Sequence, residues 1–136
     1  MGDPRIRVLV ADGHALMRHA LKRLLEEDEE IAVVGETGDF ESVVKQALAC
    51  RPHVLVLDVR MPGAAGLESI QQLRAHAPEA ELVVVTTENN PTFANRVRQS
   101  GALGLVLKDA AEVELSEAVR RAARGEEYRS RRVTDT

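Results

Sequence analysis

The sequence predicts one α/β domain, in which a parallel β-sheet is covered by helices on both faces. Short runs of Val, Leu and Ile alternate along the chain with longer segments whose apolar residues recur at helical spacing. The apolar runs show no polar alternation, which is typical of parallel strands buried on both faces. The length of 136 residues fits a single domain with one substantial core.

The first two strand–helix units come before Pro52. An apolar run predicts a strand over 6–11, and residues 14–27 carry the apolar stripe of an amphipathic helix. Residues 31–36 form the second predicted strand. Asp39 suits the N-cap of the next helix, which we expect Pro52 to stop.

The third unit has a strand over 54–57, a glycine-containing loop over 63–66, and a helix marked by apolar residues at 67, 70 and 73. Pro78 ends that helix. The fourth strand covers 82–85.

The last two units follow the same pattern. Residues 91–100 predict a helix with proline in its first turn and Gly101 as its C-terminal cap. The fifth strand covers 103–107. Apolar residues within 115–122 define the last helix, and Gly125 lies just past its end.

Three charged residues stand at the carboxyl ends of predicted strands. Asp12 follows the first strand, Asp58 the third and Lys108 the fifth. Right-handed crossovers give a doubly wound sheet, and five strands suit the order 2-1-3-4-5. In that order strands 1 and 3 are neighbours at the switch point, where ligands bind. We therefore expect these three side chains to form one site.

The residue types in this site favour phosphoryl transfer. Two nearby carboxylates repel each other by roughly 4 kcal/mol at an effective dielectric of 20, so they need a cation beside them. Oxygen ligands of this kind suit Mg²⁺. Lys108 offers a mobile positive charge for a phosphoryl group, and Thr86, which follows the fourth strand, offers a hydroxyl at the same edge.

With these residues in place, residues 5–125 resemble the receiver domain of bacterial two-component response regulators, in the NarL/FixJ (LuxR-type) subfamily. The motifs that carry the resemblance are Val10-Ala11-Asp12-Gly13-His14, Val34-Gly35-Glu36, Asp58-Val59-Arg60-Met61-Pro62-Gly63 and Leu107-Lys108-Asp109. The resemblance implies a three-layer (βα)5 fold of the flavodoxin/CheY-like type.

The resemblance also implies a role for each site residue. Asp58 accepts a phosphoryl group from a histidine kinase. Asp12, Asp58 and the backbone carbonyl of Arg60 hold Mg²⁺, and Lys108 contacts the phosphoryl oxygens. Thr86 turns towards the phosphoryl group and shifts the surface of the fourth helix, fifth strand and fifth helix. Such a domain is not an enzyme, apart from slow loss of its own phosphoryl group.

The sequence departs from the family pattern at three positions. Gly13 replaces a second acid that normally binds the metal, Leu105 replaces an aromatic switch partner, and Ala65 replaces an acid in the loop after Pro62. The Gly13 substitution favours an alternative, a pseudo-receiver controlled without phosphate by ligand or protein binding and dimerisation. A small hydrolase with Asp58 as nucleophile and a flavin-binding domain are weaker alternatives.

Two further residues near the site have simpler interpretations. We interpret His14 as the start of a helix and not as a ligand or a phosphoryl donor. Arg60 is expected to be a solvated loop residue; a second hypothesis is that its guanidinium leans over Asp12 and Asp58 and replaces missing metal charge.

Composition sets the remaining expectations. A formal charge of −4 argues against a nucleic-acid-binding face, and a single cysteine, Cys50, excludes an internal disulfide. No apolar stretch is long enough to span a membrane and no signal peptide is apparent, which fits a cytoplasmic protein. We expect a receiver domain over 1–125 and a linker over 126–136. The linker would lead to a helix-turn-helix DNA-binding domain absent from this chain. The sequence leaves open whether the chain is a piece of a longer regulator or a stand-alone receiver, and we favour the first because a linker would have no purpose in a stand-alone domain. We expect a homodimer that binds DNA only through that further domain.

Overall fold

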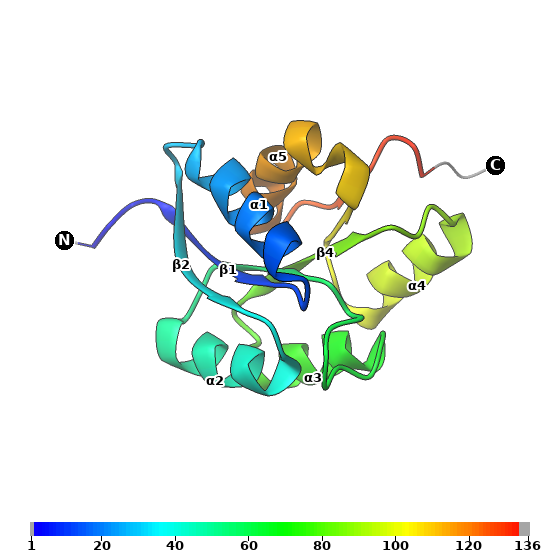
Figure 1. The fold of residues 1–136 in the computed structure, drawn as a ribbon, viewed down its shortest axis with the longest axis horizontal. Helices are drawn as coiled ribbons and strands as arrows, with labels where there is room; N and C mark the ends of the chain where they lie inside the picture. Colours follow the sequence, from blue (N-terminus) through cyan, green and yellow to red (C-terminus); the bar gives the residue numbers. More distant parts are fainter. Residues whose placement is uncertain (1, 134–136) are drawn as a thin grey trace.

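The computed structural model describes residues 2–133 and shows a sheet between two helical layers (Figure 1). The strands are β1 Ile6–Ala11, β2 Ile31–Thr37, β3 Val54–Leu57, β4 Glu81–Thr86, β5 Gly104–Leu107 and β6 Tyr128–Arg129. The helices are α1 Ala15–Glu26, α2 Phe40–Cys50, α3 Glu68–His76, α4 Pro91–Ser100, the short 3₁₀ helix η1 Lys108–Ala110 and α5 Ala111–Ala123. The predicted α/β class is confirmed.

The sheet is parallel throughout and has the order β2-β1-β3-β4-β5-β6. The order predicted for the first five strands is therefore confirmed, and the sheet has six strands instead of the five expected. Because β1 lies between β2 and β3, the chain reverses its direction of winding there. The carboxyl ends of β1 and β3 consequently lie side by side.

Apolar side chains fill a core on each face of the sheet. On one face α1 and α5 pack over inward residues such as Val10 and Val56 of β1 and β3. On the other face α2, α3 and α4 pack over the alternate residues, such as Leu9 and Leu55. Figure 1 shows α1 and α5 above the sheet and α2 and α3 below it. This double cover explains why the central parts of β1, β3, β4 and β5 are continuous apolar runs.

Local capping fixes several helix ends. The Asp39 carboxylate accepts a hydrogen bond from Ser42 N at 2.9 Å, which confirms its predicted N-cap role. Asn90 caps α4 in the same way, with Thr92 N donating at 2.8 Å. Gly101 ends α4 with φ +118°, a left-handed conformation that favours glycine. Of these caps, Asn90 bounds the loop between Thr86 and α4 beside the candidate site.

The chain after α5 continues along the free edge of β5. Tyr128 N donates to Leu103 O at 3.0 Å, and Ser130 N donates to Leu105 O at 2.8 Å. These bonds make β6 a parallel edge strand. The side chain of Val133 is also buried, against the core on the α2–α4 face. The packed part of the domain thus continues past the expected boundary at residue 125.

Ser130 anchors this segment from a fully enclosed position. Only 1% of the residue is exposed. Its Oγ accepts a hydrogen bond from Leu107 N at 2.8 Å and donates one to Glu114 Oε1 at 2.5 Å. Residues 134–136, the rest of the expected linker, lie outside the described residues. Whether residues 126–136 connect to a further domain stays a prediction.

No helix within residues 2–133 combines the length and the apolar character needed to cross a membrane.

Candidate phosphoryl-acceptor site

The sheet brings together the three charged residues that the sequence places at strand ends. Ala11 and Leu57 are partners in the β1–β3 register, so the residues that follow them, Asp12 and Asp58, lie side by side. Lys108, directly after β5, reaches across to both. Its Nζ lies 2.6 Å from Asp58 Oδ2 and 2.9 Å from Asp12 Oδ2. The predicted convergence of these side chains is therefore found in the fold.

The three charged side chains of this cluster are largely shielded from water. The side chain of Asp12 is fully buried, and those of Asp58 and Lys108 are only 9% and 10% exposed. Burial of the ammonium by itself lowers the pKa of Lys108. Its hydrogen bond with Asp58 and its attraction to both Asp58 and Asp12 outweigh burial, so the pKa of Lys108 lies above its ordinary value of 10.5. Lys108 is consequently a full cation at neutral pH.

Asp12 retains an incompletely satisfied oxygen. Its Oδ1 accepts a hydrogen bond from His14 N at 2.9 Å. Its Oδ2 is buried and lies within ion-pair distance of Lys108 Nζ, but the angles fall outside hydrogen-bond geometry. Two carboxylates and one ammonium leave a net negative charge at this position. Such an oxygen, in a negatively charged cluster, suits a further cation.

Asp58 is held by the backbone on both sides. Asp58 N donates to Ala11 O at 3.0 Å, which extends the β1–β3 ladder by one residue. Its Oδ1 accepts a hydrogen bond from Arg60 N at 2.9 Å. The remaining oxygen, Oδ2, faces Lys108. Both carboxylate oxygens therefore have fixed positions beside a single cation.

The guanidinium of Arg60 does not cover the carboxylates. Its Nη2 donates to Glu88 Oε1 at 2.6 Å, and 55% of the side chain is exposed. The hypothesis that it replaces missing metal charge is wrong in this structure, because Glu88, in the loop after β4, offers the arginine a closer carboxylate. Lys108 supplies the neutralising charge. The role predicted for the Arg60 carbonyl stays a prediction.

Thr86 lies at the same edge but engages its own loop. Only 3% of this residue is exposed, and its Oγ1 accepts a hydrogen bond from Glu88 N at 3.0 Å. Among residues 2–133, no hydrogen bond joins Thr86 to Asp58. The Thr86 hydroxyl thus lies near the site but is hydrogen-bonded to the β4–α4 loop. Its switch role stays a prediction.

The backbone around Gly13 is closely packed. A Cβ added at this position would lie 2.7 Å from Cδ of Pro62 and 3.6 Å from Gly38 O. A side chain here would force the proline loop to move. The loop after β3 therefore packs directly against the backbone of Gly13, where a second acid would begin.

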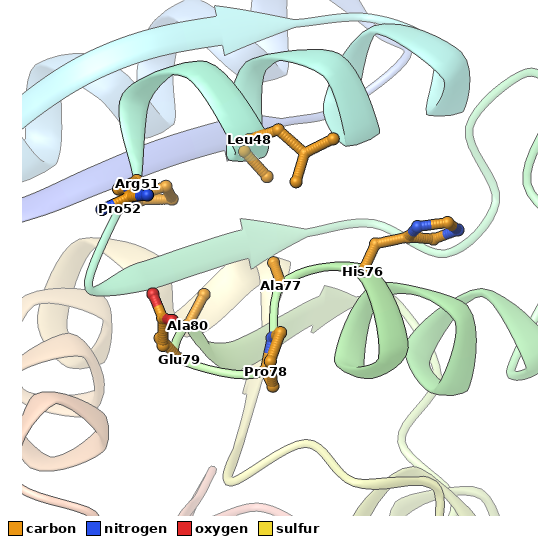
Figure 2. Close-up of a pocket in the computed structure, with 9 residues that line it drawn as sticks. Leu48, Arg51, Pro52, His76, Ala77, Pro78, Glu79 and Ala80 are labelled. Carbon is orange, nitrogen blue, oxygen red and sulfur yellow. The ribbon is translucent and has the colours of Figure 1, made fainter.

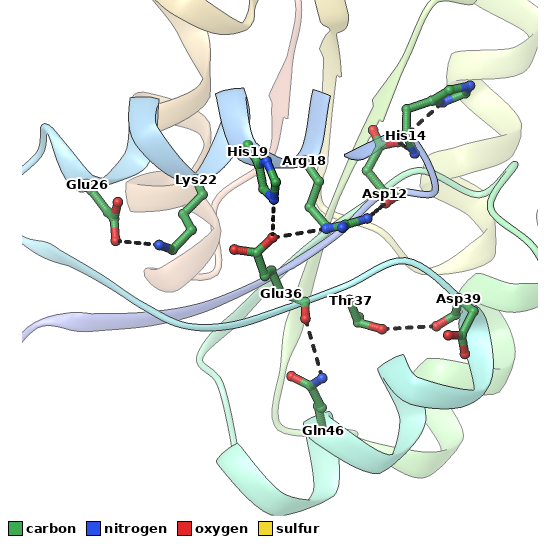
Figure 3. Close-up of polar contacts among 10 residues, drawn as sticks. All are labelled: Asp12, His14, Arg18, His19, Lys22, Glu26, Glu36, Thr37, Asp39 and Gln46. Atoms are coloured by element: carbon green, nitrogen blue, oxygen red, sulfur yellow. Dashed lines mark hydrogen bonds and ion pairs between the residues drawn. The ribbon is translucent and has the colours of Figure 1, made fainter. Parts of the chain in front are cut away.

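Arg18 is a site residue that the sequence analysis missed. Its Nη1 donates to the backbone carbonyl of Asp12 at 2.9 Å, and its Nε donates to Glu36 Oε1 at 3.0 Å (Figure 3). Gly38 leaves room for this guanidinium, because a Cβ there would lie 2.8 Å from Nη1. Arg18 lies on the polar side of an amphipathic helix, so periodicity alone gave no signal for its contact with Asp12.

A surface pocket elsewhere does not share this chemistry. It lies between residues 47–52 at the end of α2 and residues 76–80 after α3 (Figure 2). Those segments lead into the amino ends of β3 and β4, whereas Asp58 follows the carboxyl end of β3. The candidate functional site is therefore the cluster of Asp12, Asp58 and Lys108 at the carboxyl ends of the strands, and not this pocket.

Comparisons with known proteins agree with this geometry. A family model described as the response regulator receiver domain matches residues 8–120. The chain is 37% identical over 123 residues to the response regulator GacA of Pseudomonas aeruginosa, and the match covers 90% of this chain and 58% of that protein. The chain therefore spans little more than half the length of this relative.

Solved structures give the same result. The RcsB response regulator of Salmonella typhimurium superposes with a TM-score of 0.90 at 28% identity, over 96% of this chain and 66% of that chain. The signal receiver domain of the putative response regulator NarL from Mycobacterium tuberculosis superposes with a TM-score of 0.84 at 31% identity, over 91% of this chain and all of that one.

Proposed function

The chain belongs to the response regulator receiver family, in its NarL/FixJ (LuxR-type) branch, and we propose that Asp58 accepts a phosphoryl group from a histidine kinase. One observation carries the proposal: Lys108 Nζ lies within 3 Å of oxygens from both Asp58 and Asp12 at one edge of the sheet. A nucleophilic carboxylate, a second acid and a buried ammonium are the groups that phosphoryl transfer needs.

The transfer step follows from these groups. An oxygen of Asp58 forms a bond to the phosphorus of a phosphohistidine, the P–N bond breaks, and the imidazole leaves with the electron pair. The product is an acyl phosphate, a group whose charge near −2 replaces the single negative charge of the Asp58 carboxylate. Lys108 then leaves its contact with Asp58 Oδ2 and pairs with phosphoryl oxygens, where charge-assisted hydrogen bonds are strongest.

The donor set fits Mg²⁺. The buried Oδ2 of Asp12 lacks a partner in hydrogen-bond geometry, and the cluster carries a net negative charge. Asp12, Asp58 and the backbone carbonyl of Arg60 would hold the ion. When bound, Mg²⁺ supplies positive charge that neutralises the phosphoryl oxygens.

Phosphorylation changes the output through the loop that holds Thr86. The Thr86 hydroxyl exchanges its hydrogen bond from Glu88 N for a phosphoryl oxygen, and this shifts the surface of α4, β5 and α5 between two states. The partners are a histidine kinase, a second copy of the chain, and a helix-turn-helix domain that regulates transcription. Only that domain binds DNA, and the protein works in the cytoplasm. A solved structure of the similar RcsB protein concerns the interaction of that protein with DNA. This supports a DNA-binding output domain.

Members of this family are not enzymes in the ordinary sense, and this domain is a phosphoryl acceptor. Water in the site removes the phosphoryl group slowly. Arg60 and Glu88 form an ion pair at the rim of the site. In this position they can limit the access of water to the phosphoryl group.

One observation favours a second candidate function, a pseudo-receiver regulated without phosphate. Gly13 offers no metal-binding side chain, and Pro62 packs where such a side chain would begin. In this alternative Lys108 stays paired with both acids permanently, and ligand or protein binding and dimerisation control the output.

Intact mass after incubation with an acyl phosphate tests the proposal. The purified chain with Mg²⁺ and acetyl phosphate should gain one phosphoryl group, and Asp58→Ala should gain none. Asp39→Ala, which removes an exposed helix cap, serves as the matched control and should gain the same mass as the parent. No adduct on the parent chain, together with no Mg²⁺ binding, would favour the pseudo-receiver.

A further inference from the structure

We propose that His14 is a ligand of the cation site and takes the place of the acid missing at position 13. The site would then bind first-row transition-metal ions such as Co²⁺ and Ni²⁺ in clear preference to Mg²⁺. This inference rests on the proposed function, since it concerns the same site. It revises the interpretation of His14 as only the start of a helix.

The first argument is proximity. Asp12, His14 and Asp58 each present a ligand atom, and these atoms all lie within 4.8 Å of one another. Two ligands of one ion, each about 2.1 Å from it, are separated by roughly 3 Å when adjacent and about 4 Å when opposite. His14 Nδ1 lies 3.5 Å from Asp12 Oδ1, which is within this range. Over residues 2–133 this is the one such group of three side chains.

The second argument is the freedom of the imidazole. The backbone N–H of His14 donates a hydrogen bond to Asp12 Oδ1, and this bond keeps the residue beside the Asp12 carboxylate. The side chain is 84% exposed and can turn without displacing a packed neighbour. Figure 3 shows His14 beside Asp12 at the beginning of α1.

The third argument is that position 13 cannot supply the ligand. Pro62 Cδ occupies the space where a side chain would start. The adjacent residue, His14, is therefore the nearest side chain that can complete the set. The buried Asp12 Oδ2, which lacks a hydrogen-bond partner in good geometry although Lys108 Nζ lies 2.9 Å away, is a further group that a cation would satisfy.

The change of ligand alters the choice of metal. A third carboxylate would raise the negative charge of the site and favour a hard ion such as Mg²⁺. A neutral imidazole adds no charge but offers a nitrogen lone pair, which suits Co²⁺, Ni²⁺ and Zn²⁺. Lys108 already cancels one of the two carboxylate charges, so the electrostatic attraction for Mg²⁺ is weaker than it would be with two unpaired carboxylates.

Calorimetric titration of the purified chain with CoCl₂ and, separately, with MgCl₂ tests the proposal. His14→Ala should weaken Co²⁺ binding on the order of tenfold, the loss typical of a disrupted ligand set, and change Mg²⁺ binding by less than about twofold. His14→Asp should move the preference back towards Mg²⁺. His19→Ala, which removes another partly exposed histidine of α1, is the matched control and should change neither affinity. Thermal unfolding of each variant establishes that it is folded.

Equal affinities for Co²⁺ in the parent chain and His14→Ala would overturn the proposal, as would an equal loss for both metals. The absorption spectrum of the Co²⁺-loaded chain gives a second readout, because loss of a nitrogen ligand changes its intensity and position. Mass gain from acetyl phosphate is measured in parallel. Phosphorylation of Asp58 with an unchanged Co²⁺ affinity in His14→Ala would reject this inference alone. No phosphorylation with a His14-dependent Co²⁺ affinity would reject the proposed function alone.

Discussion

Lys108 is the residue on which both buried carboxylates depend. Its ammonium lies between Asp58 and the fully buried Asp12, and no other side-chain cation within residues 2–133 forms an ion pair with either acid apart from the weaker contact of His14. Removal of one partner from a buried ion pair is costly because the remaining charge stays desolvated. The cluster of charges is therefore held together by the side chain of Lys108.

The substitution Lys108→Met should lower the free energy of unfolding by about 3 kcal/mol. A second change, Asp58→Asn in the same chain, should recover part of this loss because one unpaired charge is removed. Urea denaturation measures both effects. Lys22→Met, which breaks an exposed pair with Glu26, is the control and should change stability by less than about 0.5 kcal/mol. An equal effect of the two lysine substitutions would contradict the structural role assigned to Lys108.

The pH dependence of the stabilisation by Lys108 follows from the direction of its pKa shift. The pKa of Lys108 is raised in the folded state, so its stabilising effect is complete below the ordinary pKa of 10.5. The contribution is lost only as the pH rises through the higher folded-state value. The stability difference between the parent chain and Lys108→Met should therefore be constant between pH 7 and 9. A difference that already shrinks in that range would contradict the raised pKa.

At the scale of single residues, strand ends were predictable and loop contacts were not. Asp12, Asp58 and Lys108 follow apolar runs, and parallel strands end at one edge, so their meeting follows from topology. The ion pair of Arg60 with Glu88 depends on the path of the β4–α4 loop, and the pattern of apolar residues does not determine that path. The contact of Arg18 with the Asp12 carbonyl likewise requires the position of a helix relative to a turn.

At the scale of elements, β6 is the strand that the sequence did not reveal. It has two residues, Tyr128 and Arg129, and a polar sequence around it, so no apolar run marks it. Its pairing relies on backbone bonds to β5 and on the buried Ser130 side chain. β1, β3, β4 and β5 were predictable because each contributes side chains to both cores, and the edge strand β2 was predictable from its own apolar run.

Ser130→Ala should lower the free energy of unfolding by about 1 to 3 kcal/mol, because it leaves Leu107 N and the Glu114 carboxylate without their partner in a buried position. Chemical denaturation gives the value. Ser116→Ala, at a half-buried position on α5, is the control and should stay within about 0.5 kcal/mol of the parent. A negligible loss for Ser130→Ala would mean that the segment after α5 does not dock in solution.

At the scale of the whole molecule, β6 covers an edge of the sheet that would otherwise be open. An uncovered edge strand presents unpaired N–H and C=O groups to other chains. A chain shortened to residues 1–125 should therefore self-associate more strongly than one shortened to residues 1–133. Sedimentation velocity compares the two. Identical sedimentation and identical stability would show that the domain ends at residue 125, as the sequence alone suggested.

The central claim, that Asp58 accepts a phosphoryl group, is tested most directly by locating that group. The chain is treated with acetyl phosphate and Mg²⁺, the acyl phosphate is reduced with borohydride, and the peptides are sequenced by mass spectrometry. Conversion of Asp58 to homoserine, absent without acetyl phosphate, is the predicted result. An unmodified Asp58, or modification at another residue such as His14, would contradict the claim.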